Sequence, residues 1–176
     1  ILLDLRDNGG GYLQPATMLA TEFLSKGDLL VYNQGAHYPR EDFRADHTGR
    51  LKELPLTVLV NEFSASASEI FAGAMQDQDR ALIIGRRTFG KGLVQVPFDL
   101  KDGSTIRLTV ARYHTPSGRS IQKSYAKGYE AYAEDLEQRY EHGELYSADS
   151  ITRPDTTRYF TRGGRVVYGG GGITPD

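Results

Sequence analysis

The fold is decided by residues 55–85, which read PLTVLVNEFSASASEIFAGAMQDQDRALIIG. The apolar run Pro55–Val60 is typical of a buried strand, and Ala81–Ile84 is a second such run, ended by Gly85. Between the two runs, apolar residues recur at helical spacing from about Ala67 to Gln78. A strand, a helix and a strand in so short a stretch predict a βαβ crossover with parallel pairing of the two strands.

The flanking segments extend this α/β pattern. Turn residues separate further runs with strand or helix spacing. We expect a strand at Ile1–Leu5 before a glycine-rich turn, a helix at Tyr12–Ser25, a strand at Leu29–Tyr32, a polar excursion or hairpin over 33–52, a hairpin of Leu93–Phe98 with Thr105–Tyr113, a helix at Gly128–His142 and a late hairpin over Arg158–Tyr168.

Composition narrows the class of protein. A chain of 176 residues suits one domain, and a net charge of −2 gives no sign of a nucleic-acid or anionic-membrane surface. The absence of cysteine excludes disulfides, cysteine nucleophiles and thiolate metal sites. We expect no cofactor and no metal site. Because the chain opens inside an apolar run and closes without a polar tail, we interpret it as a fragment of a longer chain.

Three serines, Ser64, Ser66 and Ser68, lie at the junction between the central strand and its helix. A helix N-terminus stabilises developing negative charge, so a serine there can act as a nucleophile if a base removes its proton. Helix capping is the alternative, because Ser66 and Glu69 have the spacing of a capping box. The sequence pattern alone leaves both interpretations open.

Lys91 is the candidate base. It lies between Gly90 and Gly92, which allow close approach of the backbone, and Phe89 offers apolar cover. Burial there would favour the neutral amine, which can accept a proton. An ordinary surface lysine is the alternative.

Two other chemistries have less support. A Ser–His–Asp triad has no positive indication, although its members can be far apart in sequence. All the histidines lie in charged or loop-like segments: His37, His47, His114 and His142. Residues 85–92 match the G-x-x-x-x-G-K pattern of a phosphate-binding loop. That motif needs Ser or Thr where Gly92 stands and a helix where a strand is expected, which argues against nucleotide binding.

Five motifs occur in order along the chain: DLRDNGGG at 4–11, SASASEI at 64–70, TFGKG at 88–92 followed by Val94-Gln95, YHTPSGRSI at 113–121, and the closing GITPD. Together they resemble the carboxy-terminal processing, or tail-specific, proteases of peptidase family S41. The resemblance implies a ClpP/crotonase-like core of stacked ββα units. It also implies hydrolysis of peptide bonds near the C-termini of protein substrates.

The resemblance also implies roles for individual residues. Ser66 matches the nucleophile, Lys91 the base, and Gln95 the glutamine that supports the lysine. If Leu93–Phe98 is a strand, Lys91 and Gln95 share its alternation and face one side. The oxyanion hole would use the amides of Ala67 and Gly10, with the next glycine as the alternative.

Two acidic residues on the central helix are interpreted as structural. Asp77 matches an acidic position of some tail-specific proteases, but it lies about 16 Å along the helix from Ser66, too far to touch the hydroxyl. Glu69 is first a capping-box partner and only secondly an organiser of the site.

The resemblance divides the chain into a catalytic core at 1–122, a charged insert with a helix and a hairpin at 123–168, and a closing core motif at 169–176. It implies protein or peptide substrates with accessible C-termini, a PDZ domain upstream, no nucleic-acid partner, and a place in the bacterial periplasm or cell envelope. It does not indicate the oligomeric state. The alternative function is a non-catalytic peptide-binding or scaffolding module that retains the protease fold.

Overall fold

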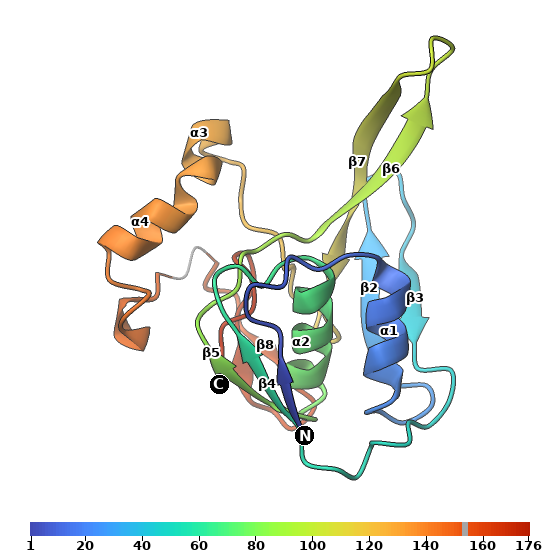
Figure 1. The fold of residues 1–176 in the computed structure, drawn as a ribbon, viewed down its shortest axis with the longest axis vertical. Coiled ribbons are helices and arrows are strands. Elements are labelled where there is room, and N and C mark those ends of the chain that lie inside the picture. The colour runs from blue at the N-terminus through green and yellow to red at the C-terminus, as the bar shows by residue number, and fades with distance from the viewer. Residues whose placement is uncertain (153–154) are drawn as a thin grey trace.

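The computed structural model of the protein describes residues 1–152 and 155–176 (Figure 1). Its first sheet is parallel, with strand order β1–β4–β5. These strands span Leu2–Asp4, Thr57–Val60 and Leu82–Gly85, and helix α2, Ala67–Asp77, connects the last two. The predicted βαβ crossover is therefore confirmed.

Helix α2 is the central element of the fold. All its residues are buried, because it packs against β5, β2 and helix α1, Leu13–Thr21. Phe71 and Met75 of α2 share one apolar core with Val58 of β4 and Ile83 of β5. Figure 1 shows α2 between the parallel strands and the α1–β2 side of the molecule. This burial fixes both ends of α2 in position.

The second sheet is antiparallel, with strand order β3–β2–β7–β6. Its strands span Leu29–Gln34 (β2), Glu41–Arg44 (β3), Leu93–Asp99 (β6) and Thr105–His114 (β7). The predicted hairpin of β6 and β7 is confirmed, and its outer half projects from the body as a long arm (Figure 1). The polar excursion after β2 contains the short strand β3.

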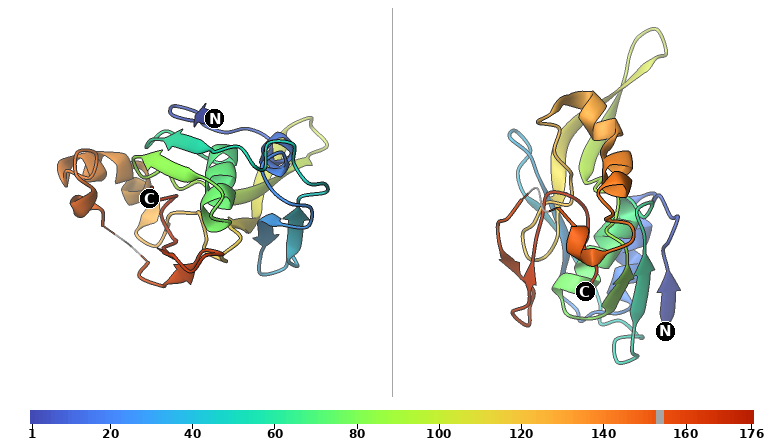
Figure 2. Two further views of the ribbon diagram at one scale, coloured as in Figure 1. Left: turned by 90° about the horizontal axis from the view of Figure 1, so that it is seen from below. Right: turned by 90° about the vertical axis from the view of Figure 1, so that its left-hand side faces the viewer.

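The last third of the chain holds short elements. They are α3 (Gly128–Ala133), α4 (Asp135–Glu141), a 3-10 helix (Ala148–Ser150), β8 (Tyr159–Phe160) and β9 (Val166–Val167). The β8–β9 hairpin lies against the C-terminal end of α2, where the Arg162 amide donates to the Asp77 carbonyl at 2.8 Å. Figure 2 shows α3 and α4 in orange, standing away from the sheets.

The helix predicted over Gly128–His142 is divided in the structure into two short helices, α3 and α4, which meet at Glu134. No residue of α3 is buried, and only Arg139 of α4 is, so little packing holds the segment as one straight helix. The late hairpin of β8 and β9 is confirmed. Residues 153–154 of the predicted insert lie outside the described residues.

The C-terminal residues return to the core. Ile173 is fully buried, and the Asp176 amide donates to the carbonyl of Ile83 in β5 at 3.0 Å. Helix α1 is shorter at both ends than the predicted Tyr12–Ser25. Among the described residues, no helix has the length and apolarity that a bilayer crossing needs.

Candidate active site

Ser66 lies at the N-cap of α2 in a strained conformation. Its φ of 57° and ψ of −116° fall outside the regions that non-glycine residues normally adopt. Such strain costs on the order of 1–3 kcal/mol and tends to occur at functional sites, where the surrounding structure holds it. The next amide, that of Ala67, belongs to the first turn of α2, where amides lack an intrahelical acceptor.

The glycine turn at Gly10 packs directly against this serine. Gly10 has a φ of +89°, and a Cβ built on it would overlap the Ala65 carbonyl oxygen and the Ala67 amide nitrogen. Only glycine fits such a close approach. The Gly10 amide donates to Oδ1 of Asn8 at 2.9 Å, and the same oxygen accepts the Ser68 hydroxyl at 3.0 Å. Asn8 therefore ties the glycine turn to the start of α2.

Glu69 connects Ser66 to residues 88–92, here called the lysine loop because they carry Lys91. Its carboxylate is fully buried; Oε1 accepts the Thr88 hydroxyl at 2.5 Å and the Gly90 amide at 2.7 Å. Oε2 accepts the amides of Ser66 and Lys91, each at 2.8 Å. Because two amides bind one oxygen, the backbones at Ser66 and Lys91 must be close neighbours. Burial raises the pKa of Glu69, against the opposing effect of these four hydrogen bonds.

The loop that carries Lys91 is irregular yet thoroughly hydrogen-bonded. Every amide from Thr88 to Gly92 donates a bond: to Ile173 O, Ser64 O, Glu69 Oε1, Glu69 Oε2 and Gln122 Oε1 in turn. The Thr88 hydroxyl also accepts the Ile173 amide at 2.7 Å, which joins the closing GITPD motif to the site. A loop with all its amides paired has a well-defined backbone path.

The expected burial of Lys91 was wrong. Its side chain is exposed, and Phe89 covers a different lysine. The buried lysine is Lys123, whose Nζ lies 4.3 Å from the Phe89 ring centroid and 4.2 Å from that of Tyr132. Burial lowers the pKa of Lys123, while its ion pair with Asp135 acts in the opposite direction. The glycines around Lys91 serve the backbone contacts of the loop rather than burial of the amine.

Gln95 lies in β6, where it is exposed and donates weakly to the Thr109 hydroxyl at 3.5 Å. Lys91 precedes the first residue of β6, and the pairing register shifts between Val94 and Gln95. The argument that Lys91 and Gln95 share strand alternation therefore does not hold.

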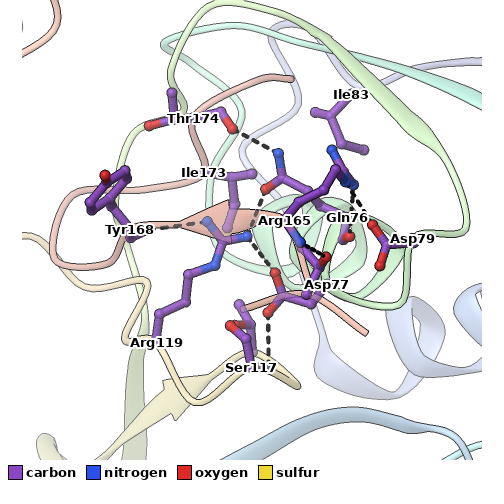
Figure 3. Close-up of polar contacts among 12 residues, drawn as sticks. Gln76, Asp77, Asp79, Ile83, Ser117, Arg119, Arg165, Tyr168, Ile173 and Thr174 are labelled. Carbon is purple, nitrogen blue, oxygen red and sulfur yellow. Dashed lines mark hydrogen bonds and ion pairs between the residues drawn. The ribbon is translucent and has the colours of Figure 1, made fainter. Parts of the chain in front are cut away.

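Asp77 lies at the opposite end of α2 and holds a separate buried network (Figure 3). Its Oδ1 pairs with Arg119 Nη2 at 2.7 Å, and its Oδ2 accepts the Ser117 amide at 3.0 Å. Arg119 also donates to Gln76 Oε1 at 2.6 Å. These contacts fasten the end of α2 to the YHTPSGRSI motif, in agreement with a structural role for Asp77.

Comparison with known proteins places this arrangement in context. The model of peptidase family S41 matches residues 1–130. The chain is 46% identical over 125 residues to the chloroplastic C-terminal processing peptidase of Tetradesmus obliquus, covering 70% of this chain and 26% of that protein. It is also 46% identical over 122 residues to the carboxyl-terminal-processing protease of Synechocystis, covering 69% of this chain and 28% of that protein.

A solved structure gives the same result at the level of the fold. The photosystem II D1 C-terminal processing protease superimposes with a TM-score of 0.65 at 45% sequence identity. The match covers 69% of this chain and 31% of that protein. The chain thus spans between a quarter and a third of the length of these relatives.

Proposed function

Because the chain belongs to peptidase family S41, we propose that it forms the catalytic core of a serine endopeptidase in which Ser66 is the nucleophile and Lys91 the base. The observation that carries the proposal is the Glu69 carboxylate, which binds the backbone amides of both residues through one oxygen. The strained backbone of Ser66 at the N-terminus of α2 independently supports its role as the nucleophile.

The proposed reaction proceeds through an acyl-enzyme. The neutral amine of Lys91 takes the proton from the Ser66 hydroxyl as the oxygen attacks the carbonyl carbon of the scissile peptide bond. The resulting ammonium then protonates the departing amine, and an ester remains on Ser66. Water, deprotonated by the same amine, hydrolyses the ester and restores the serine.

Two further groups complete the proposed site. The Ala67 amide is the first oxyanion donor, because it follows the nucleophile in the first turn of α2. The Gly10 amide is the second, and it must give up its bond with Asn8 to serve. Gln95 is proposed to orient the lysine amine once substrate is bound.

In the proposed mechanism, the bound substrate helps to position the Lys91 amine. The Lys91 side chain is exposed in the free chain, so packing does not confine its amine. A peptide lying between Ser66 and the loop would confine the amine beside the serine and exclude water from it. We therefore expect the base to be completed by the substrate rather than prepared in advance.

The names of the relatives, which describe processing at carboxyl termini, support the proposed substrate class, and the family resemblance supports the proposed domain partner and location. We propose protein or peptide substrates with accessible C-termini, an upstream PDZ domain in the intact gene product, and residence in the bacterial periplasm or cell envelope. The ClpP/crotonase description of the core remains a prediction. The alternative function, a non-catalytic peptide-binding module, is favoured only by the exposure of Lys91.

A fluorophosphonate probe on the intact gene product separates the two functions. We expect covalent labelling at Ser66 that is abolished in Ser66→Ala and strongly slowed in Lys91→Ala. Lys101→Ala is the matched control, because Lys101 is an exposed lysine in the turn of the β6–β7 hairpin and should label normally. Peptide binding without any labelling would favour the non-catalytic module, and normal labelling of Lys91→Ala would exclude the lysine base.

A further inference from the structure

Residues 123–147, here called the α3–α4 segment, reach back to the chain just before Lys91. Arg139 of α4 is buried, and its Nη2 donates to the Arg87 carbonyl at 2.5 Å. Its Nη1 donates to the Thr88 carbonyl at 3.1 Å. One guanidinium therefore binds two successive carbonyls at the start of the lysine loop.

A buried carboxylate holds this guanidinium in place. Glu144 accepts Arg139 Nε at 2.9 Å, and it accepts Arg87 through both of its oxygens, at 2.7 and 2.8 Å. The remaining Arg87 donor, Nη1, binds the Gly171 carbonyl at 2.8 Å. The side chain and the carbonyl of Arg87 are thus both bound by the α3–α4 segment.

Lys123 makes a second attachment on the other side of the loop. Its amide donates to the Gly90 carbonyl at 3.0 Å, and its ammonium lies against the rings of Phe89 and Tyr132. The ammonium also binds the Tyr132 carbonyl and the Asp135 carboxylate, each at 3.1 Å. The first turns of the α3–α4 segment are in this way fixed to the loop.

The lysine loop is consequently held from two directions. Glu69 of the core binds its amides at Gly90 and Lys91, while the α3–α4 segment binds its carbonyls at Arg87, Thr88 and Gly90. A peptide plane whose two ends are both bound cannot rotate without breaking a hydrogen bond. Arg139 therefore fixes the two peptide planes that carry the Thr88 and Phe89 amides, and the Lys123 amide fixes the plane between Gly90 and Lys91, whose amide binds Glu69.

We propose that the α3–α4 segment is a positioning element for Lys91, with Arg139 as its principal positioning residue. Arg139 binds the backbone of Arg87 and Thr88, so it would act on the lysine through the loop. The expected effect of Arg139 on catalysis rests on the proposed function, whereas its expected effect on the lysine loop does not. Displacement of the loop should lower kcat and leave KM nearly unchanged, since it moves the base without altering substrate contacts.

The test compares three variants in the intact gene product. Arg139→Gln removes the bound guanidinium, and Arg139→Lys keeps a cation beside Glu144 that can still reach a carbonyl. Arg165→Gln is the matched control, because Arg165 pairs with Asp79 and Asp176 away from the loop. Hydrogen–deuterium exchange of the amides over 88–92 reports on the loop without requiring activity.

We expect Arg139→Gln to speed exchange first at the Thr88 and Phe89 amides, whose peptide planes it binds, and to lower kcat by roughly ten- to a hundredfold at constant KM. Arg139→Lys should recover part of both, and Arg165→Gln should change neither. Unchanged exchange in a folded Arg139→Gln protein, or an equal effect of Arg165→Gln, would overturn the inference. If the wild-type protein never labels at Ser66 while the exchange results hold, the proposed function fails and the positioning of the loop stands.

Discussion

Substitution of Glu69 by glutamine tests the central contact of the site. The change conserves shape but replaces one acceptor oxygen with an NH2 group, whereas both oxygens of Glu69 accept bonds in the native protein. In the less costly orientation of the new glutamine side chain, its oxygen still accepts the hydrogen bonds from the backbone amides of Ser66 and Lys91. The NH2 then faces the Thr88 hydroxyl, which can accept, and the Gly90 amide, which cannot.

The magnitude follows from this count of partners. One buried amide left without an acceptor costs about 1–3 kcal/mol, and each retained bond weakens because its acceptor is no longer charged. Relief of the buried charge, the effect that raises the pKa of Glu69, works in the opposite direction. We therefore expect Glu69→Gln to lower the free energy of unfolding by about 2–4 kcal/mol, a large part of the roughly 5–15 kcal/mol typical of a domain.

Urea denaturation measures this loss, with Glu62→Gln as the matched control. Glu62 is also buried and binds Arg86 at 2.6 and 3.0 Å, but the Arg86 side chain is 45% exposed, so water can replace the lost ion pair. The control should lose less than about 1 kcal/mol. Equal losses in the two variants would refute the reasoning. The rate of Ser66 labelling should fall in Glu69→Gln alone.

Three further predictions concern other contacts. Asp77→Ala should lower the free energy of unfolding by about 3–5 kcal/mol in urea titrations, because it strands the buried Arg119 charge; a loss below 1 kcal/mol would contradict the buried pair. Burial lowers the pKa of His114, so the wild type should lose stability as the pH falls below about 6.5, where the histidine of the unfolded chain binds protons more readily than that of the folded chain. His114→Phe preserves the stacking on Tyr32, so its melting temperature should fall less with acid than that of the wild type. The same dependence of melting temperature on pH in both proteins would contradict this prediction. Gly10→Ala should slow fluorophosphonate labelling at Ser66 at least tenfold, since the added Cβ would overlap the Ala67 amide; unchanged labelling would show that the turn is not held there.

The parts of the fold that sequence patterns predict are those set by local periodicity. The apolar runs around α2 predict the parallel crossover, and the turn residues of Asp99–Gly103 between two strand-like segments predict the β6–β7 hairpin. The helix over Gly128–His142 was predicted as one element because its charges and tyrosines suit a helix. Without a buried face, however, nothing opposes the break at Glu134.

The contacts of the candidate site also include some that local sequence spacing predicts and others that it does not. The contact of Glu69 with the Ser66 amide is local and follows from capping-box spacing. Its contacts with Thr88, Gly90 and Lys91 depend on how the loop after β5 returns to α2, which no spacing encodes. The glycines beside Lys91 predict close approach of the backbone, and in the structure the backbone at Gly171, Gly172 and Gln122 does pack against them.

Sequence patterns also give no signal for Arg139, Glu144 or Lys123. Each occurs in a charged segment where most such residues are solvated, yet all are buried. Their burial follows from tertiary pairing with Arg87 and with the rings of Phe89 and Tyr132. Periodicity cannot reveal such pairs, because the partners lie on different elements.

Ser66 and the backbone of Lys91 are fixed before substrate binds, while the lysine side chain is not. Ordering a free lysine side chain costs roughly 2 kcal/mol of rotamer entropy, equivalent to about a thirtyfold factor in an equilibrium. A substrate that fills the space beside the loop would meet this cost through its own contacts. Peptides that bind without confining the amine would be held but cut slowly. Under the proposed mechanism, a rigid loop with a substrate-ordered amine would make selectivity a matter of kcat, and it would account for the three side chains that hold this short loop: Glu69, Lys123 and Arg139.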